Sequence, residues 1–269
     1  MGMTRIGTIS YLNAYPLVAN LSRNPQGVEL VEGPPSELAQ RLRSRDLDVA
    51  LVPQVEACLS PEYRIVPGPC IACDGPVRSI LFFRRVPWSE VKTIAVDRSS
   101  NSSVELLRVL RHIDGLPQVS PEEIDPDLGR LEGDDPLDAV LLIGDDALVA
   151  EASDWDRDDL GELWKERTDL PFVFALWVGR EGLDTSTLEL LTSAWRKGIR
   201  EKADLAGTFV ANHPDILPHK EAQAYLSDNI TYRLGSKQIE SLIEFHRLRI
   251  ESGADIDSHW HPVFFEEVP

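Results

Sequence analysis

The sequence predicts an α/β fold with two lobes and a ligand cleft between them. Strand-like and helix-like stretches alternate along two successive parts of the chain, which is typical of α/β proteins with a mainly parallel sheet. Some strands are continuous apolar runs, such as "LDVALVP" at 47–53, and parallel strands buried on both faces have this character. The C-terminal third is mostly helical and is free to pack back on the first part.

The individual elements follow from periodicity and from the turn residues between them. In the first part, which ends near Val86-Pro87, we expect helices over 11–21 and 34–46, the second capped by Ser36. The expected strands of this part are 4–10, 28–33, 47–53, 64–75 and 77–85. The expected strands of the second part and its return are 92–97, 139–143 and 170–180, with helices over 103–113, 185–212, 221–235 and 236–253.

Composition excludes several classes of function. The 269 residues carry a formal net charge of -18, which argues against nucleic acid and against an anionic membrane as partner. The N-terminus lacks the pattern of a secretory signal, and no run approaches the roughly 20 apolar residues that span a bilayer. We therefore expect a cytoplasmic protein whose partner is a small molecule.

The three cysteines and the six histidines give little indication of metal or redox chemistry. Cys70 and Cys73 form a C-x-x-C pair, but no second ligand pair accompanies it. His259 and His261 lack an acidic or thiol partner at ligand spacing, so packing of the chain end is the simpler interpretation. No glycine-rich nucleotide motif is present. We expect neither a metal nor a cofactor.

The most unusual stretch is "DRSSNSS", between an apolar strand and an amphipathic helix. The first turn of a helix has unsatisfied N–H groups and the positive end of the helix dipole. A single serine there would serve as a cap, whereas this run exceeds what capping needs. We therefore predict a binding site for a carboxylate or phosphate. Its candidate residues are Ser99, Ser100, Asn101, Ser102 and Ser103.

Three other junctions carry candidate side chains. In "SYLNAYP", Ser10, Tyr11 and Asn13 follow the first strand, where a helix cap with a solvated asparagine is an equal alternative. In "CDGPVRS", Arg78 and Ser79 follow a Gly-Pro turn, and the simpler interpretation is a hinge with a surface ion pair. In "LIGDDAL", the candidates are Gly144 and Asp145, with an ordinary turn as the alternative.

Taken in order, several segments of the chain resemble the chorismate dehydratases of the futalosine route to menaquinone. The similar segments are "SYLNAYP", "LDVALVPQVE", "IVPGPCIACDGPVRSILFF", "IAVDRSSNSSVELLRVL", "LLIGDDAL" and "DLGELWKERTDLPFVFALW". The resemblance implies a fold similar to type 2 periplasmic binding proteins, used as an enzyme without a cofactor. Lobe one would comprise residues 1–86 and 176–269, and lobe two residues 87–175.

The resemblance also implies roles for single residues. Asn13 and Ser79 match the family's active-site asparagine and serine, and Ser99 to Ser103 match its serine-rich helix start. Cys73 departs from the family, where serine is expected, but the two side chains are similar in size. The substrate would be chorismate, a dicarboxylate that loses a proton from C3 and hydroxide from C4 to become aromatic.

The base that takes the C3 proton is left open by the sequence. One hypothesis is that the enolpyruvyl carboxylate of chorismate is the base, with Asn13 orienting the reacting part. The rival is a protein carboxylate, Asp145 or Asp74. Two other functions stay open, a solute-binding protein for small anions and the naphthoate-forming enzyme of the same pathway.

Overall fold

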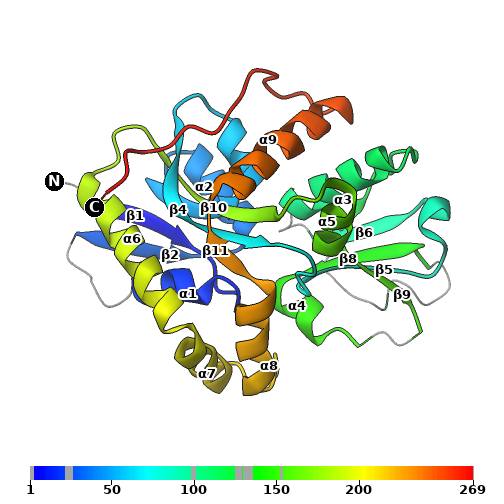
Figure 1. Cartoon of the computed structure of the whole chain (residues 1–269), viewed down its shortest axis with the longest axis horizontal. Helices are drawn as coiled ribbons and strands as arrows, with labels where there is room; N and C mark the ends of the chain where they lie inside the picture. The colour runs from blue at the N-terminus through cyan, green and yellow to red at the C-terminus, as the bar shows by residue number, and fades with distance from the viewer. Residues whose placement is uncertain are drawn as a thin grey trace.

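Two mixed β-sheets organise the chain, and helices pack around them (Figure 1). The computed structural model describes residues 3–21, 27–97, 101–124, 129, 136–151 and 154–268. Within them, the predicted α/β class is confirmed. The helices are α1 (Tyr15–Val18), α2 (Pro35–Arg43), α3 (Asn101–Ile113), α4 (Gly144–Val149), α5 (Leu160–Thr168), α6 (Thr185–Arg200), α7 (Lys202–Asn212), α8 (His219–Ala224) and α9 (Ser236–Glu251).

The first sheet combines the N-terminal strands with two strands that return from later in the chain. Its strands are β1 (Thr4–Thr8), β2 (Val28–Glu32), β3 (Val49–Pro53), β4 (Tyr63–Cys73), β10 (Phe172–Arg180) and β11 (Thr231–Arg233). They lie in the order β11-β4-β10-β3-β1-β2. Strand β10 is therefore central, and every one of its residues up to Gly179 is buried.

The second sheet is built from the middle of the chain. Its strands are β5 (Ile80–Arg84), β6 (Ile94–Asp97), β7 (Glu122–Ile124), β8 (Ala139–Ile143) and β9 (Asp156–Asp159), in the order β7-β6-β8-β5-β9. The prediction of mainly parallel sheets is wrong. Strand β10 runs antiparallel to both of its neighbours, and so does β5. A continuous apolar run shows that a strand is buried on both faces, but it does not show the direction of the neighbouring strand.

The chain passes between the sheets twice. It leaves the first sheet after β4 and enters the second with β5, so the first crossing is residues 74–79. It returns from α5 to β10 through residues 169–171. The lobe boundaries expected at 86 and 176 lie a few residues beyond these crossings. The sequence shows where an apolar strand begins but not which sheet it joins.

Helix starts in the first part differ from the prediction. The helix expected over 11–21 is only the short α1, and residues 11–14 form a turn ahead of it. Pro16 explains why the helix begins no earlier, because proline lacks an N–H and is tolerated only in the first turn. Neither serine is a helix cap. The N-cap of α1 is Ala14, four residues after the exposed Ser10, and the N-cap of α2 is Pro34, so Ser36 lies inside that helix.

The stretch 221–235 is the other local difference. We expected one helix, but α8 ends at Ala224 and is followed by a π-helical turn, Tyr225–Asn229. The chain then pairs with β4 as β11, where Tyr232 is buried and Arg233 is exposed. The β-branched and aromatic residues of "NITYR" favour a strand locally, and the pairing with β4 decides the outcome.

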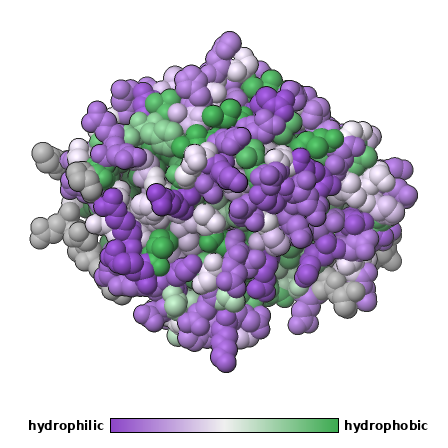
Figure 2. Space-filling view, viewed as in Figure 1, coloured by the Kyte–Doolittle hydropathy of each residue, from purple (hydrophilic) through white to green (hydrophobic). Residues whose placement is uncertain are grey.

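Apolar side chains gather between the sheets and their helices. Hydrophilic residues cover most of the face seen in Figure 2. Aromatic rings of α5, β10 and α9 meet where the two sheets adjoin: Trp164, Phe172 and Phe245 have centroids 4.9–5.7 Å apart. Edge-on packing of this kind fixes the relative position of the three elements. No helix in the described part of the chain is long and apolar enough to cross a membrane.

We predict that Gly198→Ala destabilises the protein, although alanine normally favours a helix over glycine. Gly198 lies in α6, and a Cβ atom there would sit 1.7 Å from the carbonyl oxygen of Pro16 in α1. Such overpacking costs about 1–3 kcal/mol. Urea denaturation should show the loss, while Ser193→Ala, on an exposed position of the same helix, should be nearly neutral. An unchanged or raised stability of Gly198→Ala would mean that α1 and α6 can separate.

Candidate active site

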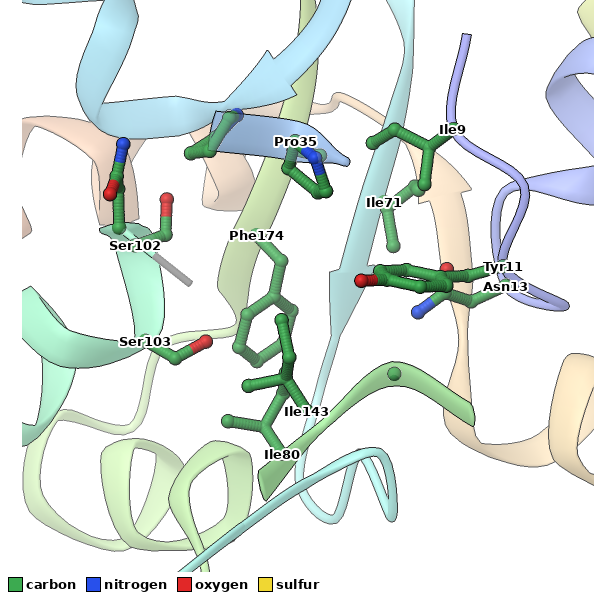
Figure 3. Close-up of a pocket in the computed structure, with 14 residues that line it drawn as sticks. Ile9, Tyr11, Asn13, Pro35, Ile71, Ile80, Ser102, Ser103, Ile143 and Phe174 are labelled. Atoms are coloured by element: carbon green, nitrogen blue, oxygen red, sulfur yellow. The ribbon is translucent and has the colours of Figure 1, made fainter. Parts of the chain in front are cut away.

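A pocket opens between the two sheets, with walls from both (Figure 3). It contains about 480 Å³ of empty space, part of which is open to solvent. Apolar side chains make most of its surface, and hydroxyl and amide groups stand on opposite sides. The lining residues are Ile9, Tyr11, Asn13, Pro35, Pro53, Ile71, Ile80, Asn101, Ser102, Ser103, Ile143, Gly144, Phe174 and Ala175.

The polar group on the side of the second sheet is the start of α3. Ser102 and Ser103 are 5% and 3% exposed, and both line the pocket. The Ser102 hydroxyl has no hydrogen-bond partner among the described residues. The first turn of α3 contains no acidic residue of its own, so no carboxylate of this turn competes with a ligand for the positive end of the helix dipole. A buried hydroxyl without a partner is costly, and a ligand in the pocket would provide one.

The polar group on the other side is the turn after β1. Tyr11 and Asn13 reach toward the pocket from this turn, with Phe174 between them and Ser103 in the view of Figure 3. The Tyr232 hydroxyl donates a 2.9 Å hydrogen bond to the carbonyl oxygen of Asn13. The turn is therefore held by a residue that is distant in sequence.

Gly144 lies against the ring of Tyr11 in the wall of the pocket. Its φ of +61° is a left-handed conformation that favours glycine, and a Cβ would lie 3.1 Å from the Tyr11 ring. Its N–H donates a 2.8 Å hydrogen bond to the carbonyl oxygen of Ser79. Gly144, where a turn is predicted, is the first residue of helix α4, which directly follows β8.

Ser79 itself lies behind the pocket wall. It is fully buried and is not among the lining residues. Its Oγ accepts a 2.8 Å hydrogen bond from the Tyr225 hydroxyl, which also hydrogen-bonds to the side chain of Asn13. Asn13 and Ser79, which lie in loops far apart in the sequence, thus share the phenol of Tyr225 as a partner.

Asp145 supports the turn that carries Asn13. Its Oδ1 accepts a 3.1 Å hydrogen bond from the N–H of Leu12. Burial raises the pKa of Asp145 from its usual 3.8 to about 6, although the Leu12 N–H acts in the opposite direction. Asp145 is next to Gly144 in sequence but does not line the pocket.

Asn101 is held from the side of the first sheet. Glu56, in the 3₁₀ turn after β3, is 1% exposed and hydrogen-bonds to the Asn101 side chain. Burial raises the pKa of Glu56, while Arg43 at 3.3 Å opposes that shift. The contact links the first sheet to the start of α3.

The structure brings together only some of the predicted residues. Five line one pocket in addition to Asn13, and Ser79 and Asp145 lie directly behind its wall. The five are Tyr11, Asn101, Ser102, Ser103 and Gly144. Ser10 is exposed and Arg78 half-buried, and neither lines it. Ser99 and Ser100 lie outside the described residues.

The cysteine pair and the histidine pair do not form a metal or disulfide site among the described residues. Cys70 and Cys73 are free and fully buried in β4, and burial raises the pKa of both thiols. His259 and His261 are exposed, and the described part of the chain holds no group of three or more potential metal ligands.

A protein family described as menaquinone biosynthesis matches residues 4–250 of the chain. The chain belongs to this family. Two curated members of similar sequence are both named chorismate dehydratase. The one from Thermus thermophilus is 29% identical over 80% of this chain and 85% of its own length. The one from Campylobacter jejuni is 25% identical over 89% of this chain and 94% of its own.

Solved structures place the fold of this menaquinone-biosynthesis family member. A protein of Archaeoglobus fulgidus has a TM-score of 0.76 at 18% identity, covering 93% of this chain and 97% of its own. The alkanesulfonate-binding protein SsuA of Xanthomonas axonopodis pv. citri has a TM-score of 0.65 at 16% identity, covering 93% and 92%. A Candida albicans protein with the generic periplasmic binding protein fold has a TM-score of 0.59 at 11% identity, covering 94% and 90%. The predicted two-lobed periplasmic-binding-protein-like fold is confirmed.

Tyr225 and Glu56 are not indicated as site residues by the sequence. Tyr225 lies in a stretch that reads as helix, 146 residues from Ser79, and no local pattern links the two. Glu56 is a single carboxylate after a buried strand, which normally reads as solvated. The apolar run before Glu56 is a local sign of its burial, whereas the residues before Tyr225 are mostly polar or small.

We predict that Asp145→Asn removes part of the pH dependence of stability in this family member. Because the pKa of Asp145 is raised, the folded state binds its proton more tightly than the unfolded state. Its contribution to stability is full below about pH 4 and falls as the pH rises through about 6. Asparagine can still accept the Leu12 hydrogen bond without this loss.

The measurement is urea denaturation of both proteins at pH 4, 5, 6 and 7. The free energy of unfolding of the variant relative to wild type should increase across this range, because carboxylates common to both proteins cancel. A difference that stays constant with pH would show that Asp145 has an ordinary pKa in the folded protein.

Proposed function

We propose that the chain is a chorismate dehydratase, which converts chorismate to 3-[(1-carboxyvinyl)oxy]benzoate and water in menaquinone biosynthesis by the futalosine route. The observation that carries the proposal is the buried hydroxyl of Ser102 in the first turn of α3, which has no hydrogen-bond partner among the described residues. It faces a pocket whose other side bears Tyr11 and Asn13. Two relatives that bear this enzyme's name support the same conclusion.

The substrate is a dicarboxylate with an apolar ring, and the pocket suits both parts. Hydroxyls and helix N–H groups at the start of α3 receive one carboxylate. Ile71, Ile80 and Phe174 receive the ring between them. This binding needs no cofactor and no metal, and the acidic composition disfavours nucleic acid and anionic membrane as partners. We place the reaction in the cytoplasm.

The reaction removes a proton from C3 and hydroxide from C4, which together leave as water. The C3–H bonding pair becomes part of the aromatic ring, and the C4–O bond breaks with its electrons on oxygen. Conjugation with the ring carboxylate acidifies the C3 proton. Hydrogen-bond donors on that carboxylate therefore stabilise the charge that develops as the proton leaves.

The enolpyruvyl carboxylate of the substrate is the base in our proposal. The described lining side chains are apolar groups, hydroxyls and amides, which orient a substrate without taking its proton. Asn13 holds the reacting part, and a well-held intramolecular base has a high effective concentration. Asp74 is 53% exposed and pairs with Lys165 at 2.9 Å, away from the pocket. Asp145 is the stronger rival, because its pKa of about 6 suits a base and it lies next to the wall.

The test of the function is incubation of the purified protein with chorismate. Turnover should appear as the absorbance of an aromatic product, and mass analysis should show the loss of one water. Chorismate binding without turnover would instead indicate a solute-binding protein, and formation of a naphthoate product from a later precursor would indicate the other enzyme of the pathway.

We predict that Ser102→Ala and Ser103→Ala each weaken chorismate binding by about 1 kcal/mol or more, if each hydroxyl donates to a carboxylate. Titration calorimetry with a non-reacting analogue measures the affinity. Melting curves measure stability separately, because both side chains lie in the first turn of α3. Ser193→Ala, an exposed serine on α6, is the matched control. Unchanged affinity with lowered stability would mean that the two serines only support the helix.

We predict that Asp145→Asn and Asp74→Asn each keep measurable turnover, whereas Asn13→Ala loses at least about 100-fold in kcat. The substrate carboxylate is ionised at neutral pH and so remains able to accept the proton in both aspartate variants. An analogue with this carboxylate replaced by an amide should bind and not react. Loss of all turnover in folded Asp145→Asn, or a normal rate for the amide analogue, would make a protein carboxylate the base.

A further inference from the structure

We propose that Tyr225 is a positioning residue that holds the side chain of Asn13 in its working orientation, with Ser79 holding Tyr225 in turn. The inference rests on the proposed function for its kinetic consequence but not for its geometry. Tyr225 contacts neither the pocket nor the solvent, and it is fully buried. Among the lining residues of the pocket, Asn13 is the one whose side chain it hydrogen-bonds.

The hydrogen bonds of Tyr225 define a three-residue chain. The phenol donates to Ser79 Oγ at 2.8 Å and also hydrogen-bonds to the Asn13 side chain. Asn13 lines the pocket and Ser79 lies behind it. A side-chain amide on a surface turn has several orientations of similar energy, and a buried partner of fixed position selects one of them.

The segment around Tyr225 is anchored at two further points on the same two loops. Asn229, at the end of the π-helical turn, donates a 2.9 Å hydrogen bond to the carbonyl oxygen of Pro76 in the first crossing. Tyr232 donates to the carbonyl oxygen of Asn13. Tyr232 thus fixes the backbone of Asn13 while Tyr225 fixes its side chain. A π-helical turn in place of a regular helix end is frequent at functional sites.

Tyr225 acts as a neutral phenol in this arrangement. Burial raises its pKa above the usual value, so it keeps its proton at any working pH. It therefore supplies no base for the C3 proton. The alternative interpretation is that Tyr225 is only a core side chain, whose hydroxyl is satisfied by neighbours of no functional importance.

The experiment compares wild type with Tyr225→Phe, which removes the hydroxyl and keeps the ring. We expect kcat for chorismate dehydration to fall by about tenfold or more, with KM changed by less than about threefold, because a misplaced reacting group costs rate rather than binding. The control is Tyr63→Phe, a buried tyrosine whose ring packs on Arg180 at the far end of β4, and it should leave both constants unchanged.

A second readout is independent of activity. The side-chain amide signals of Asn13 in a 15N spectrum, assigned by their loss in Asn13→Ala, should shift in Tyr225→Phe and exchange faster with solvent. Ser79→Ala should move the same signals, because the phenol loses the partner that holds it. This variant keeps the inference testable if Tyr225→Phe does not fold.

The outcomes separate the inference from the function on which it rests. Wild-type protein that does not dehydrate chorismate would overturn the proposed function, while the amide signals would still decide whether Tyr225 orients Asn13. Unchanged amide signals in Tyr225→Phe and Ser79→Ala would overturn the inference even if activity were lost. Moved signals with unchanged kcat would overturn its kinetic part.

Discussion

The carboxylate of Asp159 joins the two passages of the chain between its sheets, and the pocket depends on this connection. It accepts hydrogen bonds from the N–H groups of Val77 and Arg78 in the first crossing, at 3.1 and 2.6 Å. It also accepts from Gly161 and Glu162 at the start of α5, which leads to the second crossing, at 2.9 and 3.2 Å. Four N–H donors on one half-buried carboxylate compensate much of its desolvation, although burial still raises the pKa of Asp159. The crossings are therefore fixed relative to each other, and so are β5 and β10, the strands that follow them and contribute Ile80 and Phe174 to the pocket.

Because the junction between the sheets is fixed, neutral hydroxyl and N–H groups can stabilise an anion in the pocket. The chain has a net charge of -18, but exposed charges more than about 10 Å away are largely screened at physiological ionic strength. What a ligand meets is the local field of α3 and the hydroxyls of Ser102 and Ser103. These dipoles stabilise an anion only if they already point toward it, because reorienting them on binding would offset the gain. Rigid walls are thus a condition for the electrostatics of this pocket.

The sequence allowed the fold class, the order of most elements and part of the candidate site to be predicted. Hydrophobic periodicity reports burial, so β3, β8, β10 and α3 lie close to their predicted ranges. Residue type at a strand-to-helix junction indicated Asn13, Ser102 and Ser103. Strand direction and the change of sheet at 74–79 left no local trace, because an apolar run is the same in either sheet. Tyr225 was missed for a similar reason: its partners are set by the return of the C-terminal segment over the first turn, and that contact is made only in three dimensions.

The long-range contacts that the sequence hides are the ones that make a positioning mechanism possible. If the substrate supplies its own base, the protein contributes rate mainly by restricting motion, and each loose residue in the wall reduces that contribution. Asn13 is held at its carbonyl by Tyr232 and at its side chain by Tyr225, while Asp145 holds the N–H of the residue before it. The three supports come from β11, the turn after α8 and the start of α4. Because both sheets contribute to these supports, the orientation of a single amide reports on the assembly of the whole fold.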